Sequence, residues 1–231
     1  MTMTVRFALL SALLLTACGG VGNGAVTERS IEVGAFKTVD INSGITARVS
    51  LGTPSVTVRT DENLQHLVVV TVENGRLWVG HPPMINTFPT KLEVDIVTDR
   101  LEGVFASGAA DVTAVATAIG TFPVQASGAS SVTVEGVSSE KVTIDASGAS
   151  EVTLSGAAVA NGTAQASGAS RVVLTELPFE KLSIDVSGAS SLTARVSNEV
   201  RGQVSGASKA VVEGAASTRV ETSGASTFDS K

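Results

Sequence analysis

Aromatic residues are scarce in this 231-residue chain, which has no tyrosine, one tryptophan and seven phenylalanines. An ordinary β-sandwich core would use more of them, and so would a surface that stacks sugars or nucleotide bases. The chain is still 43% hydrophobic, so we expect a thin core of valine, isoleucine, leucine and alanine. Its net charge of −6 makes nucleic acid a poor partner.

Cysteine and histidine are almost absent. Cys18 is the only cysteine, so no disulfide can form within the chain. The two histidines, His66 and His81, have no cysteine partner and no metal-ligand spacing. We therefore predict no metal site and no cofactor. No clustered catalytic set is evident either, and the sequence predicts a protein that is not an enzyme.

Long hydrophobic runs are missing as well. The apolar run from Phe7 to Leu15, preceded by Arg6, is shorter than the roughly 20 residues that a membrane-spanning helix needs. It has the length of a signal-peptide core, and small residues follow it. Residues 1–17 are therefore predicted to be a signal peptide.

The cleavage site of this signal peptide resembles the bacterial lipobox, in the form Leu15-Thr16-Ala17-Cys18. By that resemblance, cleavage follows Ala17, and Cys18 carries a diacylglyceryl group and an N-acyl chain. Two or more acyl chains hold a protein stably on a membrane, at about 0.8 kcal/mol per buried CH₂. The alternative is an ordinary secretory signal with an incidental cysteine. Residue 19, directly after Cys18, is glycine and not aspartate, which fits sorting of a lipoprotein to the outer membrane. Residues 18–32 are expected to form a lipidated, flexible tether.

One motif of small residues, which reads Ser-Gly-Ala-Ser in most copies, recurs through the second half of the chain. We call this motif the phrase. Its Ser-Gly pairs are spaced by twenty residues four times and then by eighteen twice, beginning at Ser107, Ser127, Ser147, Ser167, Ser187, Ser205 and Ser223. A fixed period in this range is typical of solenoids and repeat arrays. Alternating apolar residues on either side of each phrase indicate strands. The apolar positions that follow the phrases are Val132/Val134, Val152/Leu154, Val172/Leu174, Leu192/Ala194 and Ala210/Val212.

A single repeat cannot fold by itself. Burying three or four apolar side chains contributes roughly 5–10 kcal/mol, whereas ordering a coil of this length costs on the order of 20–40 kcal/mol of backbone entropy. Stacked neighbours supply the missing hydrogen bonds and a shared core. The sequence therefore predicts an all-β parallel solenoid with 18–20 residues per coil, each coil about 4.8 Å above the last.

The small residues fit the corners of such a solenoid, where the chain turns sharply and identical positions stack. Glycine adopts positive φ without steric cost, and serine hydroxyls can bond to neighbouring backbone. We expect two structural ladders, Ser127-Ser147-Ser167-Ser187 and Gly128-Gly148-Gly168-Gly188. A nucleophilic serine or a phosphate-binding loop is the rival interpretation, but no lysine or histidine recurs in register with the phrase.

A polar column precedes each phrase by two residues. It alternates amides with carboxylates in the order Gln125, Asp145, Gln165, Asp185, Gln203 and Glu221. Alternation keeps like charges apart and lets each amide donate to a neighbouring carboxylate. The acids would lie about 9–10 Å apart, too far for one Ca²⁺ to bridge. We therefore expect a structural ladder and not a metal site. Glu151 and Arg171 are expected to pair across adjacent coils.

The first half of the chain is less regular. Asn74-Gly75, between alternating β-formers, predicts a tight hairpin, and the segments around residues 54–64 and 91–99 read as further strands. The segment Asn42-Ser43-Gly44-Ile45 resembles a degenerate copy of the phrase. Residues 80–90 read as a proline-rich loop. Trp78 is expected to cap the end of the solenoid and not to form a ligand platform.

The order of these motifs resembles one protein family. It runs through Phe36, Val39-Asp40-Ile41, Gly44-Ile45-Thr46, Ser55-Val56-Thr57-Val58, Asp61-Glu62-Asn63-Leu64, Glu73-Asn74-Gly75 and Ser107-Gly108-Ala109. The chain is similar to the auto-transporter adhesin, head GIN domain family, a family of unknown function. The resemblance covers about residues 33–225 and implies a right-handed, single-stranded β-helix, often on exported proteins or lipoproteins. Thr46 stands where the family's Gly-Ile-Asn motif has asparagine, so no role of that asparagine transfers.

The predicted organisation therefore has four parts: a signal peptide (1–17), a tether (18–32), a solenoid with an irregular half (33–105) and a regular half (106–225), and a C-terminal cap or tail (226–231). The leading hypothesis is a lipid-anchored cell-envelope protein, expected in the outer membrane, that displays the solenoid to an envelope protein or glycan. A polysaccharide lyase or hydrolase is the second hypothesis, with Asp40, Asp61, Asp95 and Asp99 as candidate acids. A passive scaffold is the third. The sequence does not decide the oligomeric state.

Overall fold

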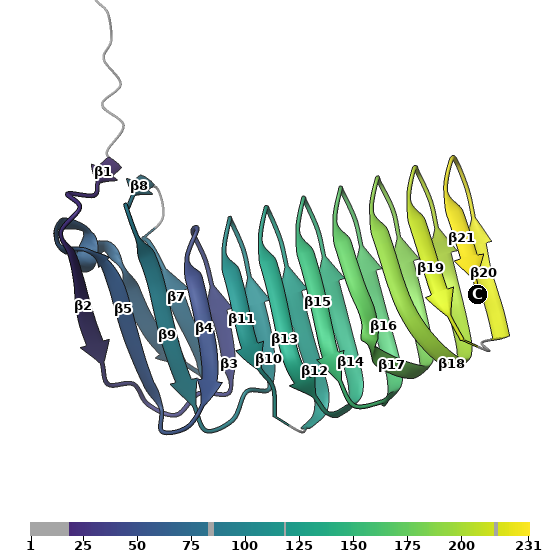
Figure 1. Cartoon of the computed structure of the whole chain (residues 1–231), viewed down its shortest axis with the longest axis horizontal. Helices are drawn as coiled ribbons and strands as arrows, with labels where there is room; N and C mark the ends of the chain where they lie inside the picture. Colours follow the sequence, from purple (N-terminus) through teal and green to yellow (C-terminus); the bar gives the residue numbers. More distant parts are fainter. Residues whose placement is uncertain (1–18, 83–85, 118, 215–216) are drawn as a thin grey trace, which may run out of the picture.

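The computed structural model describes residues 19–82, 86–117, 119–214 and 217–231. The predicted signal peptide and Cys18 lie outside these residues. Strands account for most of the chain (Figure 1). In chain order the elements are β1 (Gly19–Val21), β2 (Val26–Ile31), β3 (Thr38–Ile41), β4 (Thr46–Leu51), β5 (Ser55–Asp61), the 3₁₀ helix η1 (Glu62–Leu67), β6 (Val69–Glu73), β7 (Arg76–Gly80), β8 (Asn86–Phe88), β9 (Leu92–Thr98), β10 (Gly103–Ala106), β11 (Asp111–Val115), β12 (Ile119–Ala126), β13 (Ser131–Val137), β14 (Ser139–Ala146), β15 (Glu151–Gly156), β16 (Val159–Ala166), β17 (Arg171–Val186), β18 (Ser191–Val204), β19 (Lys209–Glu213), β20 (Ser217–Thr222) and β21 (Thr227–Ser230).

The strands wind into stacked coils along one axis, which confirms the predicted parallel β-solenoid (Figure 1). Each regular coil contributes one stretch of strand to each of two sheets. One sheet, which we call the ladder face, contains β7, β3, β10, β12, β14, β16, the C-terminal halves of β17 and β18, and β20. The other, the opposite face, contains β9, β4, β11, β13, β15, the N-terminal halves of β17 and β18, β19 and β21.

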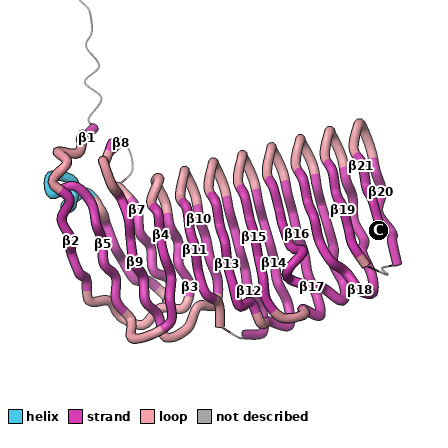
Figure 2. The backbone as a smooth tube through the Cα atoms, in the orientation of Figure 1, coloured by secondary structure: helices cyan, strands magenta, loops and turns pink. Residues whose placement is uncertain are grey.

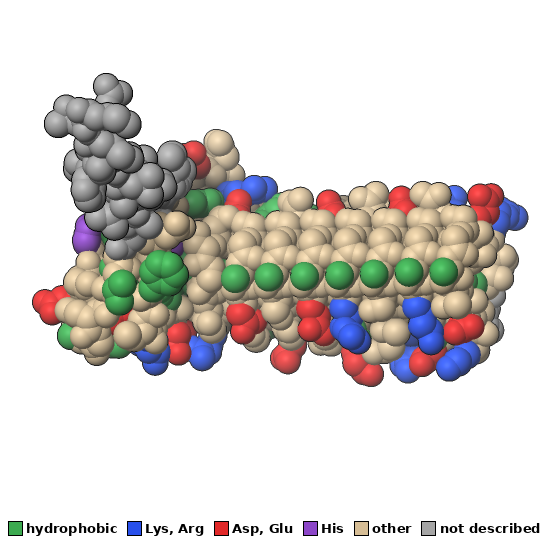
Figure 3. All heavy atoms as spheres, turned by 90° about the horizontal axis from the view of Figure 1, so that it is seen from above, with side chains coloured by type: hydrophobic (Ala, Val, Ile, Leu, Met, Phe, Trp, Pro, Cys, Tyr) green, Lys and Arg blue, Asp and Glu red, His purple; other side chains and the backbone are tan. Residues whose placement is uncertain are grey.

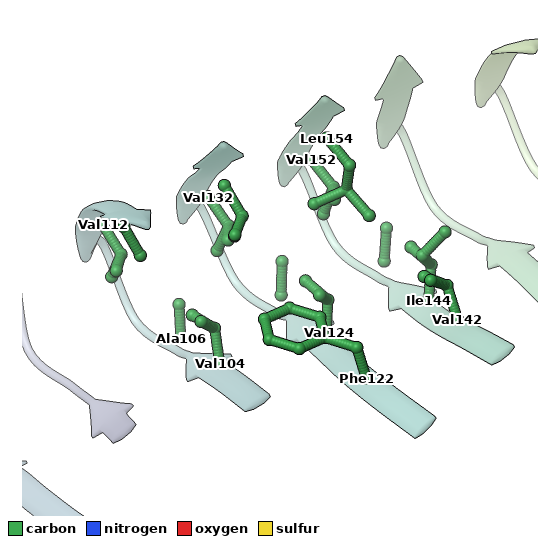
Figure 4. Close-up of a cluster of buried hydrophobic side chains, with 14 of the residues drawn as sticks. Val104, Ala106, Val112, Phe122, Val124, Val132, Val142, Ile144, Val152 and Leu154 are labelled. Carbon is green, nitrogen blue, oxygen red and sulfur yellow. The ribbon is translucent and has the colours of Figure 1, made fainter. Parts of the chain in front are cut away.

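The core is a narrow layer between these two sheets. The predicted inward positions on the opposite face, from Val132 and Val134 to Ala210 and Val212, are all fully buried. Their counterparts on the ladder face, which include Phe122, Val124, Val142 and Ile144, are also buried (Figure 4). The alternation in the sequence therefore predicted the core correctly, because a strand sends successive side chains to opposite faces.

The small-residue phrases form the corners along one edge of the solenoid, drawn as loops in Figure 2. Gly128 and Gly148 stack directly: a Cβ added to Gly148 would lie 2.5 Å from the carbonyl oxygen of Gly128, and φ of Gly148 is 74°. Gly168 and Gly188 continue this contact from coil to coil. Figure 3 looks down on the corners and shows a straight row of hydrophobic side chains, which are the exposed alanines of the phrase.

The serines of the phrase have two different environments. The first serine is half-buried in the six phrases from Ser107 to Ser205, and its backbone N–H donates to the coil below, as from Ser147 to the Ala126 carbonyl at 2.9 Å. The same contact is made at Ser127, Ser167 and Ser187. The serine at the fourth position of the phrase is buried in the five copies from Ser130 to Ser208. The Ser170 hydroxyl, for example, donates to the Ala146 carbonyl of the coil below at 3.2 Å. The sequence analysis did not distinguish this buried serine from the first one.

The irregular half builds the N-terminal end of the solenoid. The predicted hairpin is confirmed: β6 and β7 pair antiparallel around Asn74 and Gly75, both at positive φ. The strands β5 and β9 also pair antiparallel. Ser43 lies beneath Gly108 in the stack of corners, and a Cβ on Gly108 would lie 3.1 Å from its nitrogen. The segment around Ser43 therefore occupies the position of a corner.

The segment expected as a flexible tether is largely strand. β1 pairs with β8, and β2 pairs antiparallel with β5 at the end of the opposite face. The expectation failed because the exposed β2 lacks a strong apolar pattern, whereas its six backbone pairings with β5 order it. Asp61 holds the segment that precedes β2: its carboxylate accepts from the Gly24 N–H at 2.7 Å. β1 thus starts at Gly19, the first residue that the structure describes.

The C-terminal segment, expected as a cap or tail, contains the strand β21. This strand pairs parallel with β19 and extends the opposite face by one rung. Phe228 lies in register with the inward Ala210 and packs, partly buried, against the end of the core. The last coil is therefore closed by a larger side chain than the alanine below it.

Candidate binding face

The polar column predicted from the repeat lies on the outer surface of the ladder face. The strand register places Gln125 beside Asp145, Asp145 beside Gln165 and Gln165 beside Asp185. The column continues through Gln203 and Glu221. One rung shows the amide-to-carboxylate hydrogen bond that motivated the prediction, from Gln203 Nε2 to Asp185 Oδ2 at 3.1 Å. The column therefore presents alternating donors and acceptors to solvent at every coil.

Three further side chains extend this column into the irregular half. In the same register, Phe105 lies beside Gln125 on the neighbouring strand, Asp40 lies beside Phe105, and Trp78 lies beside Asp40. The sequence analysis missed this continuation. The signal was present, because Phe105 stands two residues before Ser107, the position that the amides and carboxylates hold before the later phrases.

Shallow hollows follow one another along the ladder face. Two of about 380 and 430 Å³ lie over β14, β16, β17 and β18, around Lys181 and Asp185. A third of about 290 Å³ lies between Phe105 and Gln165, and a fourth of about 260 Å³ lies between Trp78 and Gln125. Neighbouring hollows share lining residues such as Gln125 and Gln165. Together they form an extended, mostly polar surface that crosses the strands.

In the hollow at the N-terminal end, several of the lining side chains contact one another. The Asp40 carboxylate accepts from Asn42 Nδ2 at 3.0 Å and from Arg76 Nη1 at 3.4 Å. The Arg76 guanidinium also lies 4.0 Å from the centre of the Phe105 ring, a cation–π contact. The Ser107 hydroxyl donates to Asn42 Oδ1. A half-exposed set of charged, amide and aromatic groups is thus held in one arrangement.

Trp78 does not cap the solenoid as expected. Its neighbours in β7, Leu77 and Val79, are buried in the core, whereas Trp78 is half-buried on the outer side of the ladder face. The expectation failed because alternation in β7 places the tryptophan outward once Leu77 and Val79 point inward. Trp78 therefore belongs to the surface that carries Asp40 and Phe105.

The four acids considered for polysaccharide cleavage have separate environments. Asp40 binds Asn42 and Arg76, whereas Asp95 belongs to an ion-pair network with Arg48 and Arg59 on the other sheet. Asp99 is exposed at the end of β9.

The fourth of these acids, Asp61, has a structural role. It is buried and accepts from the N–H of Thr90 and of Gly24, each at 2.7 Å. Burial acts to raise the pKa of Asp61, but these hydrogen bonds outweigh it and lower the pKa. The Asp61 carboxylate thus holds the segment around Thr90 and the N-terminal segment together.

The two histidines are far from a metal-binding arrangement. His66 lies in the last turn of η1, while His81 is buried and has its pKa lowered by that burial. His81 Nε2 lies 3.2 Å from the Thr87 hydroxyl. Among the residues that the structure describes, no three histidine, cysteine or acidic side chains gather as metal ligands. In the same residues, no helix has the length and apolarity needed to cross a bilayer.

Comparison with protein families matches residues 35–216 to the family described as "Putative auto-transporter adhesin, head GIN domain". The chain belongs to this family. The match covers both the irregular half and most of the regular coils of the head GIN solenoid. No curated protein matches the chain.

Solved structures share the fold of this head GIN protein. A "putative adhesin" from Bacteroides fragilis NCTC 9343 superimposes with a TM-score of 0.81, at 15% identity over 91% of this chain and 99% of that one. A "putative adhesin" from Parabacteroides distasonis ATCC 8503 gives 0.71, at 17% identity over 92% and 100%. A "putative lipid binding protein" from the same organism gives 0.68, at 14% identity over 92% and 99%. The family and two of these structures are described as adhesins and not as enzymes.

Proposed function

We propose that this head GIN protein is a non-enzymatic, lipid-anchored adhesin of the bacterial cell envelope that binds an extended polar polymer along its ladder face. The observation that carries the proposal is the continuous surface that hollows and polar rungs form across the strands of one sheet. Each coil adds a rung about 4.8 Å from the last, which is comparable to the length of one sugar residue. A polymer can therefore meet a new donor or acceptor at every coil.

The anchor in this proposal is acylated Cys18. Support comes from the lipobox-like Leu15-Thr16-Ala17-Cys18. A chain anchored at Cys18 would hold the N-terminal end of the solenoid next to the membrane, while the regular coils extend away from β1 (Figure 1). Outer-membrane sorting, for which Gly19 is suitable, would place the ladder face at the cell periphery.

The anchor is tested by labelling cells with radioactive palmitate and separating their membranes. We expect label on the wild-type chain in the membrane fraction, and neither label nor membrane retention for Cys18→Ser. An unlabelled wild-type chain released with the soluble proteins would contradict the anchor. Protease treatment of intact cells then shows whether the solenoid faces the exterior.

The binding role is tested by capture of envelope and extracellular polysaccharides on the immobilised protein. Asp145→Ala with Asp185→Ala removes two carboxylate rungs, and we expect this double variant to lose most of the captured material. Glu135→Ala with Glu151→Ala removes the same charge from the opposite face and should bind as the wild type does. Equal losses in both double variants, capture of no polysaccharide at all, or cleavage of any of them would contradict the proposal.

A further inference from the structure

The aromatic end of the ladder face, formed by Arg76, Trp78, Asp40 and Phe105, differs in chemistry from the rest of the column. Trp78 and Phe105 flank Asp40 on the two neighbouring strands, so the two aromatic side chains start about 10 Å apart. The Asp40 side chain is 23% exposed and the Arg76 side chain 45% exposed. A carboxylate acceptor and a guanidinium donor are thus accessible between two rings.

The Trp78 ring packs over a glycine, Gly80, whose missing side chain leaves room for it. A Cβ added to Gly80 would lie 2.8 Å from two atoms of the Trp78 six-membered ring. The indole therefore lies along the strand over Gly80, in space that a side chain would otherwise fill. A flat ring beside polar side chains matches a sugar, whose C–H face packs on an aromatic ring while its hydroxyl groups bond at the edge.

The polar groups around Trp78 are held in place before any ligand binds. Asn42 and Arg76 both bond to Asp40, and Arg76 is also held against the Phe105 ring. An ionised carboxylate forms stronger hydrogen bonds to hydroxyl groups than a neutral acceptor does. Because little side-chain freedom remains to be lost, binding a small ligand here costs less entropy.

Charge selects the class of sugar. Arg76 and Asp40 neutralise each other at the aromatic end. On the following coils the carboxylates of the column, Asp145, Asp185 and Glu221, are accompanied on the same face by the basic side chains Lys141, Lys181 and Arg201. From Gln125 to Glu221 the column itself holds only amides and carboxylates, so an anionic residue seated directly on it would be repelled. We propose that Trp78, Asp40 and Arg76 form a subsite for one residue of a neutral saccharide whose chain continues along the rungs from Gln125. This inference rests on the binding role proposed for the ladder face and names its ligand.

The chain offers a direct probe of the subsite, because Trp78 is its only tryptophan and it has no tyrosine. The full chain with Cys18→Ser is titrated with neutral pentasaccharides (β-1,4-linked glucose, β-1,4-linked N-acetylglucosamine and β-1,4-linked mannose) and with an anionic galacturonate pentasaccharide. We expect at least one neutral oligomer to shift or quench Trp78 emission in a saturable way and to protect it from acrylamide. The galacturonate should leave the emission unchanged.

Two substitutions show whether this signal comes from the proposed contacts. Asp40→Asn keeps the shape but removes the charge, and should weaken binding about tenfold or more, because hydrogen bonds to charged groups are the stronger ones. Gly80→Ala should displace the Trp78 ring and weaken binding, although the added Cβ would also lie 3.1 Å from Cβ of Asn42. Glu151→Gln, on the opposite face, makes the same charge change as Asp40→Asn and should leave the affinity unchanged.

The outcomes separate this subsite from the wider proposal. If no neutral oligomer perturbs Trp78, or if Asp40→Asn and Glu151→Gln behave alike, the subsite is wrong. Polysaccharide capture that persists in that case, and still depends on Asp145 and Asp185, leaves the adhesin proposal standing. Loss of all capture would overturn both.

Discussion

Replacing Gly148 by alanine is expected to destabilise the solenoid by roughly 2–4 kcal/mol. Two costs add at this position. The backbone has a φ of 74°, which costs an L-residue about 1–2 kcal/mol. The new Cβ would also lie 2.5 Å from the carbonyl oxygen of Gly128, a rigid backbone atom that can move only if two coils separate. Urea unfolding followed by circular dichroism measures the change.

Two matched glycines separate these costs. Gly75 has a φ of 75° but no neighbouring atom within 4 Å of an added Cβ, so Gly75→Ala should cost only about 1 kcal/mol. Gly34 has neither a positive φ nor a close neighbour, and Gly34→Ala should be nearly neutral. If Gly148→Ala is no more destabilising than Gly75→Ala, the corners are not in contact as described.

Truncating Phe122 to alanine is expected to cost about 3–5 kcal/mol. The ring is fully buried and projects with Val124 into the layer between the two sheets (Figure 4). Its neighbour in the next coil at the same position is Val142, which is smaller and cannot fill the space. A thin core with hydrogen-bonded sheets on both sides has little freedom to collapse around the cavity.

The control for this truncation is Phe88→Ala. Phe88 is 66% exposed on β8, so the same change of side chain should alter the unfolding midpoint very little. Similar losses for Phe122→Ala and Phe88→Ala would show that burial in the solenoid core is not what stabilises the coil. A loss well below that expected for Phe122→Ala alone would point to a core that adapts.

The regular half of the fold could be predicted because each level of the sequence agrees with the others. The alternation at Val152 and Leu154 gives the strand and its buried side. The recurrence of Gly148 and Gly168 at one spacing gives the stacking of coils. Gln125 and Asp145 then follow as neighbours without further information, because a constant coil length fixes the register.

The N-terminal end could not be predicted in the same way, because no repeat fixes its register. β2 is ordered by antiparallel pairing with β5 and by the distant Asp61, and neither contact leaves a pattern in residues 18–32. The aromatic end of the ladder face was missed for a related reason. Trp78, Asp40 and Phe105 come from three separated segments and become neighbours only through the pairing of β7, β3 and β10. Scarcity of aromatic residues in the whole chain did not exclude a local pair.

The stacking of coils creates both the core and the binding face, and it is tested most directly by distances between spin labels on the corners. Ala109, Ala189, Ala207 and Ala225 are exposed at equivalent corner positions. In a Cys18→Ser background, cysteine pairs from position 109 to positions 189, 207 and 225 would be labelled and measured by pulsed dipolar spectroscopy. Backbone separations of about 19, 24 and 29 Å are expected, rising by one strand spacing per coil. Separations that do not rise in equal steps with coil number would contradict the stacked solenoid.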